Sequence, residues 1–525
     1  MSNKLIEIAE DSARGGFFLF TGNALSFIIL AIGSIIVARL LGPDNYGLYS
    51  LSLIVPSILA GFTDFGISYA LTRFSAKFRA ESKSDLVASI LKSGLLFKLI
   101  IGILMSLICF IFSDIFATYI LNRSGMSFLV RIASFMILFQ TIFTALNSSF
   151  IGLDRMEGSA LIMSIQSILK TTLSPLLVVL GFSVVGALSG HVLSYMLAAI
   201  PGSLILLKYY KKLGKPSSNS FSINLKIMLG YGFPLYLSAL LGLFLSQYQT
   251  IILAFFVSNF EIGNFSIATN LSSLINVLVF PLGVLFPAFS KVNPDSDELK
   301  RAFKLSVKYV ALLIVPATTI VAILSKDIVN TLYGYSYNLA PLFLSLYILA
   351  FLYTGLGSIV LGYLFSGIGE TKVVFKWNLI NLSIFLPLAP ILTMFYSVQG
   401  LIFAFLASSL LSLAYAIFIA IKRINVKFDL KASIKIYLAS FLSTIPILVL
   451  LQFSSLNSFF NLIICGLIFL FTYLTLIPLI GAINESDLEN FKIIFKRLKI
   501  VWPIIKLGLI YETKILNLRL KPSLS

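Results

Sequence analysis

The sequence predicts an all-α polytopic membrane protein with fourteen membrane-spanning helices. Its 525 residues are 58% hydrophobic and only 11% charged, and the mean hydropathy is +1.00. Soluble proteins carry roughly 25% charged residues, so charge at this density cannot cover a soluble surface of this size. Fourteen apolar runs are each long enough to cross a bilayer, which takes about 20 residues. Most of the protein surface is therefore expected to face lipid.

The apolar runs are expected to be helices, because an isolated span must satisfy its own backbone hydrogen bonds. Barrel strands would alternate apolar and polar residues over about 10 residues, and these runs do not. The first run is longer than the roughly 7–15 apolar residues of a signal peptide, so we expect no cleavable signal peptide. The runs cover approximately residues 15–41, 48–71, 87–112, 127–151, 159–181, 184–207, 227–256, 262–289, 305–325, 340–366, 373–395, 398–421, 434–452 and 457–480.

Lysine and arginine residues fall almost entirely on one side of the predicted spans. Of the 39, 34 lie on the side that holds both termini, four lie on the other side, and Lys170 lies inside a run. Because positive loops mark the cytoplasmic side, we expect both termini in the cytoplasm and the protein in the cell membrane. This sidedness, together with contact with anionic lipid head groups, explains the net charge of +18, so no nucleic acid partner is expected.

A turn sequence recurs 216 residues along the chain. "ARLLGPDNYGLYSLS" begins at Ala38 and "AFFVSNFEIGNFSIA" begins at Ala254, so that Gly47 matches Gly263. Chance similarity among apolar helices is the alternative to a true repeat. The repeat predicts two pseudo-symmetric six-helix lobes, an arrangement typical of transporters with a substrate site between the lobes. The expected parts are an N-lobe over 1–213, a C-lobe over 214–425, two extra helices over 426–483 and a cytoplasmic basic tail over 484–525.

The first string, followed by "GFTDFGISYALTRFSAK" from Gly61, resembles the start of polysaccharide-exporting flippases. These O-antigen translocase-like proteins belong to the multidrug/oligosaccharidyl-lipid/polysaccharide (MOP) superfamily. The resemblance implies a V-shaped, two-lobe transporter of the kind seen in MATE transporters and lipid II flippases. It also implies the cargo, an isoprenoid-(pyro)phosphate-linked oligosaccharide, which alternating access would move from the cytoplasmic to the outer leaflet. In the related lipid II flippases, the extra pair of helices helps to form a groove for the lipid tail.

Lys170 is the first candidate substrate-binding residue, because it lies near the centre of the fifth predicted span. A charge at mid-membrane costs about 2.5–3.5 kcal/mol on insertion scales, so such residues usually face a cavity or a partner. Gln166 and Ser174 lie four residues on either side and share its helical face. This polar face could bind a phosphate or pyrophosphate. A lysine that pairs with a carboxylate or snorkels to a wet crevice is the structural alternative.

Asp64 is the only acidic residue within a predicted span. It could bind a proton or a cation and so couple transport to a proton or sodium gradient, or it could pair with Lys170. Tight helix packing on small residues is the structural alternative. The predicted helical face of small or polar residues around it comprises Ser50, Ser57, Gly61 and Ser68.

Four further residues are weaker candidates. Arg39 is expected to point away from the polar stripe of its own helix, but in the lipid II flippases the arginine of a similar "A-R-x-x-G" string lines the central cavity. Gln140 and Asn147 share a polar face of the fourth span, which could bind sugar hydroxyls or simply join helices. His191, the only histidine, could titrate and couple an ion, although a lone histidine often only packs.

Two features remain, the cysteines and the C-terminal tail. Cys109 and Cys465 lie in apolar runs and give no metal-binding spacing, so no metal, disulfide or cofactor is expected. The tail contains "LENFKIIFKRLKIVWPIIKLG" from Leu488, whose apolar residues recur at helical spacing between lysines. It is interpreted either as an amphipathic helix on the inner leaflet or as a solvated basic tail.

Three functions are compared. The leading hypothesis is a flippase for a lipid-linked oligosaccharide in cell-surface polysaccharide or glycan assembly, acting as a monomer among membrane lipids, with glycan-assembly proteins as candidate partners. A MATE-like cation or drug antiporter would rely on buried carboxylates, often in both lobes, and the second predicted lobe has none in its spans. A membrane polymerase or ligase of lipid-linked sugars would need a catalytic site, and the outer loops show no acid–base constellation. The chain is therefore expected to be a transporter and not an enzyme.

Overall fold

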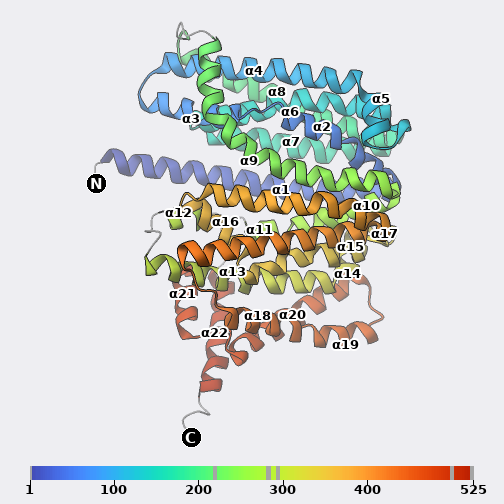
Figure 1. The fold of residues 1–525 in the computed structure, drawn as a ribbon, viewed down its shortest axis with the longest axis vertical. Coiled ribbons are helices and arrows are strands. Elements are labelled where there is room, and N and C mark those ends of the chain that lie inside the picture. Colours follow the sequence, from blue (N-terminus) through green and yellow to red (C-terminus); the bar gives the residue numbers. More distant parts are fainter. Residues whose placement is uncertain (1–2, 217–220, 280–284, 291–295, 497–501, 521–525) are drawn as a thin grey trace. The chain divides into compact units, whose positions relative to one another are not determined.

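The computed structural model describes residues 3–216, 221–279, 285–290, 296–496 and 502–520, and these residues form helices and connecting segments without strands (Figure 1). The all-α prediction is confirmed. The chain divides into two compact units. Unit 1 comprises Met1–Ser266 and Ala389–Leu401, and unit 2 comprises Ile267–Leu388 and Ile402–Ser525.

The described residues contain ten helical segments that are long and apolar enough to span a membrane, or eleven if one bent pair counts as a span. Three of the ten contain 41, 57 and 54 residues, whereas one crossing takes about 20. Each of these three is interrupted by non-helical backbone, at Gly42, at Gly181 and at Tyr396–Ser397. If each of them crosses twice, the count is compatible with the predicted fourteen spans.

Unit 1 packs its helices around an apolar core to which α3, α4, α6, α7, α8 and α9 contribute. The core includes Leu71, Ile90, Phe150 and Ile162, all at most 1% exposed. The helices are α1 (Asn3–Ser52), α2 (Ile54–Gly61), α3 (Ile67–Ala80), α4 (Ser84–Ile111), α5 (Ser113–Ile115), α6 (Ser127–Gly152), α7 (Met156–Leu177), α8 (Ser183–Lys212) and α9 (Phe221–Phe256), followed by the start of α10 (Asn259–Ser273).

Helix α4 shows how these helices suit a lipid environment. Its buried face carries Ser93, Gly94, Gly102 and Ser106, whereas its exposed face is made of large apolar side chains. In a bilayer, small residues let helix backbones approach closely, and bulky apolar residues can face the lipid. The burial pattern is therefore the one expected for a membrane-spanning bundle.

The recurring turn sequences pack against each other within unit 1. The first copy breaks at Gly42, which has φ 71°, and helical backbone resumes at Pro43. A methyl group built on Gly47 would lie 2.0 Å from the carbonyl oxygen of Asn259, and one on Gly263 would lie 2.0 Å from that of Pro43. A shift of 216 residues maps Gly47 onto Gly263 and Pro43 onto Asn259, so each contact is the equivalent of the other. This equivalence supports a true repeat. The predicted extent of the lobes stays a prediction.

The second predicted span, 48–71, is not one helix. Helix α2 ends at Gly61 and α3 begins at Ile67, and Phe65 and Gly66 between them have φ 46° and 82°. A methyl group on Gly66 would lie 2.1 Å from the backbone of Gly232 on α9. Only glycine combines this conformation with so close an approach.

Unit 2 has its own apolar core, which includes Val315, Ile436, Ile447 and Cys465, all completely buried. Besides the rest of α10, it contains α11 (Asn276–Val279), α12 (Leu285–Ser290), α13 (Asp297–Ile323), α14 (Ser325–Tyr333), α15 (Ala340–Tyr347), the 3₁₀ segment Ile348–Leu356, α16 (Ser358–Gly367), most of α17 (Thr371–Ile419), α18 (Leu430–Leu442), α19 (Ile445–Phe453), α20 (Ser458–Ile480), α21 (Glu485–Lys496) and α22 (Trp502–Leu520).

The predicted tail packs onto unit 2 as two helices. Asp487 of α21 forms an ion pair with Lys308 and accepts a hydrogen bond of 3.1 Å from the hydroxyl of Tyr309, both on α13. In α22, the hydroxyl of Tyr511 lies 2.8 Å from that of Thr475 on α20. These two described helices are therefore docked, and their predicted place on the inner leaflet stays a prediction.

Candidate functional site

A polar cluster lies inside unit 1, where α7 packs against α1 before its break at Gly42 and α8 contacts α1 after that break. Lys170 and Gln166 come from α7, and Gln166 donates a hydrogen bond of 3.2 Å to the hydroxyl of Ser194 on α8. His191 of α8 shares a hydrogen bond of 3.1 Å between its Nδ1 and the hydroxyl of Tyr49. Three of the predicted site residues, Lys170, Gln166 and His191, are therefore brought together.

Lys170 is partly buried and lies within electrostatic range of His191. The part of the chain that the structure describes places no carboxylate within ion-pair distance of it. The cluster thus combines a cation, an imidazole, a phenol, an amide and a hydroxyl. These groups can donate hydrogen bonds to an anion such as a phosphate, and bonds to charged groups are stronger than neutral ones.

Arg39 lies elsewhere on α1, three residues before the break at Gly42. Its side chain is exposed, whereas the neighbouring Val37 and Ala38 are buried. Its predicted role in the cavity continues to rest on the resemblance.

The two predicted residues of α6 differ in their contacts. Asn147 accepts a hydrogen bond from the hydroxyl of Ser159 on α7, so it joins two helices. The side-chain oxygen of Gln140 is buried and has no hydrogen-bond partner among the described residues. Gln140 is therefore the residue of the two that has an unused acceptor.

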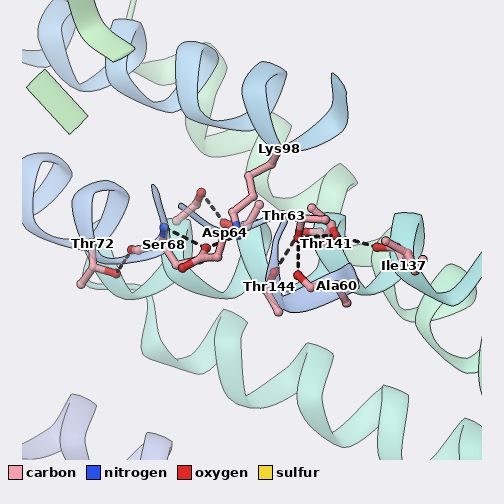
Figure 2. Close-up of polar contacts among 11 residues, drawn as sticks. Ala60, Thr63, Asp64, Ser68, Thr72, Lys98, Ile137, Thr141 and Thr144 are labelled. Atoms are coloured by element: carbon pink, nitrogen blue, oxygen red, sulfur yellow. Dashed lines mark hydrogen bonds and ion pairs between the residues drawn. The ribbon is translucent and has the colours of Figure 1, made fainter. Parts of the chain in front are cut away.

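Asp64 lies in the break between α2 and α3, and Figure 2 shows Lys98 extending from α4 to meet it. The side chain of Lys98 is 2% exposed and that of Asp64 is 24% exposed. Asp64 Oδ1 also accepts hydrogen bonds from the amide and the hydroxyl of Ser68, at 3.3 and 2.6 Å. Next to it, the hydroxyls of Thr63 and Thr141 are 2.8 Å apart and connect the break to α6.

Two expectations about this region, and one of the alternatives for Asp64, are corrected. The helical face of small or polar residues that Asp64 was expected to share with Ser57 and Ser68 does not exist as one helix, because Phe62–Gly66 interrupts it. The partner of Asp64 is Lys98 and not Lys170. Lys170 was expected to be the one lysine inside an apolar run, but Lys98 also lies inside one and is buried.

Lys98 is thus the functional candidate that sequence reasoning missed. A usable signal was present, because Lys98 lies eleven residues inside the predicted span 87–112. The described residues contain no group of three or more histidine, cysteine or acidic residues that could hold a metal ion.

Comparison with known proteins identifies the family. The family of polysaccharide biosynthesis proteins matches residues 12–293, which is more than half of the chain. The chain belongs to this family. The succinoglycan biosynthesis transport protein ExoT of Rhizobium meliloti (strain 1021) is 24% identical over 349 residues, which cover 66% of this chain and 67% of that protein. An uncharacterized membrane protein in the cps region of Klebsiella pneumoniae is 22% identical over 409 residues, covering 76% of this chain and 80% of that protein.

Solved structures share the fold of this family member. The lipid II flippase MurJ, in an inward closed conformation, superposes with a TM-score of 0.70 at 16% identity, covering 92% of this chain and 99% of that chain. An inward-facing multidrug resistance MATE transporter of the MOP superfamily superposes with a TM-score of 0.63 at 18% identity, covering 78% of this chain and 98% of that chain. The predicted fold class and the resemblance to the MOP superfamily are confirmed.

Proposed function

We propose that this protein is a flippase that moves an isoprenoid-(pyro)phosphate-linked oligosaccharide from the cytoplasmic to the outer leaflet of the cell membrane, by alternating access. The observation that carries the proposal is membership of the polysaccharide biosynthesis family together with a fold shared with a lipid II flippase. A relative named as a succinoglycan biosynthesis transport protein supports a polysaccharide-related cargo. In this role the protein makes and breaks no bond.

The polar cluster of unit 1 suits the charged end of such a cargo. Moving a phosphate across the membrane strips it of water, and an unpaired ion in an apolar medium is very costly. Lys170 lacks a described carboxylate partner, so its ammonium can offer the phosphate a charge-assisted hydrogen bond. We assign the phosphate to Lys170 and Gln166, with Arg39, Gln140 and Asn147 as further candidates along the path of the head group.

The antiporter alternative is less favoured by the described contacts. A cation antiporter needs a carboxylate that can exchange ions, but Asp64 is already paired with Lys98 and bonded to Ser68. Asp64 and His191 remain our candidates for coupling to a proton or sodium gradient. Near Asp64, the buried hydroxyl of Tyr236 lacks a partner among the described residues and is within electrostatic range of the carboxylate.

The test of this function is translocation in cells that lack their own flippase. The wild-type chain should restore the outward appearance of the lipid-linked glycan made by the cells from which the gene comes. Lys170→Gln should lower that rate by about 10- to 100-fold, because a hydrogen bond to a charged group contributes about 1.5–3 kcal/mol. Lys170→Arg keeps the charge and should retain most of the rate.

The matched control is Lys92→Gln, which removes an exposed lysine of α4 and should leave the rate unchanged. Absence of translocation by the well-expressed wild-type chain would refute the proposed function. Normal translocation by Lys170→Gln would instead remove only Lys170 from the site.

A further inference from the structure

A second polar site lies wholly within unit 2. Helix α10, the beginning of α11, the end of α15, the 3₁₀ segment Ile348–Leu356, α16 and α17 line a cavity of about 330 Å³. Among the described residues, its lining carries hydroxyl, amide and aromatic side chains but no charged residue. The volume is near the lower end of the ~300–1,000 Å³ range of small-molecule sites.

Two residues that line this cavity have hydroxyls without a hydrogen-bond partner in the part of the chain that the structure describes. Ser272 and Thr354 are 1% and 0% exposed, and their oxygens have no hydrogen-bond partner among the described residues. Buried helical hydroxyls usually bond to a carbonyl three or four residues earlier, as Thr318 does to Ile314 at 2.7 Å. Because an unsatisfied buried hydroxyl is unfavourable, these two are positioned for a partner that enters the cavity.

The backbone around the cavity is interrupted on two sides. Helix α10 ends at Ser273 and α11 begins at Asn276. The 3₁₀ segment ends at Leu356, and the next residue, Gly357, has φ 88°; the chain bends there by 54° before α16. Non-helical backbone at membrane depth is tolerated where it lines a cavity, and broken helices form the substrate sites of many transporters.

The second break is held in place by side chains of α18. Ser433 donates a hydrogen bond of 2.7 Å to the carbonyl oxygen of Gly355, and the hydroxyl of Tyr437 donates to that of Leu352. These bonds satisfy carbonyls that a regular helix would use internally. The interrupted backbone is therefore a supported feature of the fold.

Aromatic rings form one wall of the cavity. Tyr347 and Phe405 stack with their ring centroids 4.9 Å apart and their planes 6° from parallel. Aromatic faces carry partial negative charge, so they attract the weakly positive C–H groups on one face of a sugar ring. A bare metal ion would need neither this wall nor a space of this size.

We propose that this cavity binds a neutral sugar unit of the transported head group, an inference that rests on the proposed function. The unpaired hydroxyls of Ser272 and Thr354 bond to the hydroxyls of the sugar, and Tyr347 with Phe405 packs against its apolar face. A described lining without charge favours the uncharged part of the cargo, whereas the phosphate is assigned to unit 1.

The test measures binding of free glycan to the full chain in lipid nanodiscs. The probe is the mixture of oligosaccharides that mild acid releases from the lipid-linked fraction of cells of the source organism. The wild-type chain should bind a component of this mixture, and the double variant Ser272→Ala with Thr354→Val should bind it about tenfold more weakly. The same double variant should unfold at the wild-type temperature or above, because it removes hydroxyls that have no partner among the described residues.

Two further variants sharpen the test. Phe405→Leu keeps an apolar side chain but removes the stacked ring, and it should also weaken binding. Thr318→Val, which removes a buried hydroxyl that already bonds within its helix, should leave glycan binding unchanged. A wild-type chain that binds no released oligosaccharide would overturn the proposal, as would a double variant that binds normally or unfolds at a clearly lower temperature.

A wrong assignment of the cavity and a wrong proposed function would give different experimental results. If the wild-type chain translocates lipid-linked glycan but the double variant does so at the same rate, only the cavity assignment is wrong. If the wild-type chain translocates nothing, the flippase function is wrong, and the binding measurement still decides whether the cavity takes a sugar.

Discussion

Lys98 is a buried lysine whose charge is balanced by an ion pair with Asp64. Its side chain is 2% exposed, whereas that of Asp64 is 24% exposed. Removing one partner of a buried ion pair costs about 3–5 kcal/mol, because the other charge is left buried and unpaired. Asp64 retains some access to solvent and hydrogen bonds from Ser68. Removing Asp64, which leaves Lys98 buried and unpaired, should therefore destabilise the fold more than removing Lys98.

The prediction from this pair is an unequal response to mutation. Asp64→Asn should lower the free energy of unfolding by about 3 kcal/mol, and Lys98→Met should lower it less. The double variant should be more stable than Asp64→Asn alone, because methionine fills a similar volume without charge. Thermal unfolding of the purified full chain measures these differences.

The control for this prediction is an exposed pair in unit 2. Lys304 and Asp429 form an ion pair with side chains 50% and 30% exposed, and Lys304→Met should cost less than about 1 kcal/mol. Strict additivity of the Asp64→Asn and Lys98→Met effects would show that the two residues are not coupled.

Sequence reasoning predicted local groupings of site residues and missed the long-range pairing. Gln166 and Lys170 lie on one face because residues four apart on a helix are neighbours. Lys98 and Asp64 are 34 residues apart, and the helix period says nothing about which residues meet across two helices. The cavity in unit 2 was also missed, because Ser272 and Thr354 resemble any other small polar residues of a span.

At the scale of helices, the hydropathy pattern predicted two of the interruptions of the helical backbone and missed a third. The interruptions at Gly181 and at Tyr396–Ser397 lie next to or within predicted gaps between apolar runs. The interruption at Phe62–Gly66 lies inside a predicted run. The run around it is apolar, so hydropathy alone does not mark the interruption. The close approach of Gly66 to Gly232 that requires it exists only in the folded chain.

The docking of α22 on α20 should depend on pH through Glu512. This residue is 7% exposed, and burial raises the pKa of its carboxyl from 4.5 to about 7. Between these two values the docked helix binds more protons than the undocked one, so docking weakens as the pH rises through this window. Hydrogen exchange of α22 in the full chain, corrected for the intrinsic pH dependence, should be faster at pH 8 than at pH 6.

The variant Glu512→Gln tests the cause of this effect. The amide cannot ionise, so the corrected exchange of α22 should be the same at both pH values. Persistence of the pH dependence in Glu512→Gln would assign it to another group.

At the scale of the whole molecule, the segments that connect the spans of unit 1 form two sets, and the members of each set contact one another. In the first set, Arg123 donates hydrogen bonds of 2.9 and 2.7 Å to the carbonyl oxygens of Ala254 and Val257, beside the turn that packs against Gly47. In the second set, Arg79 bonds to Asp154 at 2.9 Å. Arg155, from the same connection as Asp154, lies over the ring of Tyr209, 4.9 Å from its centroid.

These sets match the alternation that the fourteen-span path requires. The first contains segments predicted to lie outside, which follow spans 1, 3 and 7. The second contains segments predicted to lie in the cytoplasm, which follow spans 2, 4 and 6. The side of the membrane on which one member lies therefore fixes the side of the others in its set. The excess of lysine and arginine predicts that the second set lies in the cytoplasm.

Cysteine labelling in intact cells tests this orientation, because both native cysteines are buried. Asp44→Cys places a thiol at an exposed position of the first turn, and Lys211→Cys places one at the exposed end of α8. A membrane-impermeant maleimide should label Asp44→Cys from outside and should label Lys211→Cys only after permeabilisation. The reverse pattern would invert the orientation but keep the path, because five predicted spans separate the two positions. Labelling of both from the same side would contradict the path itself, since an odd number of crossings cannot return the chain to the side from which it started.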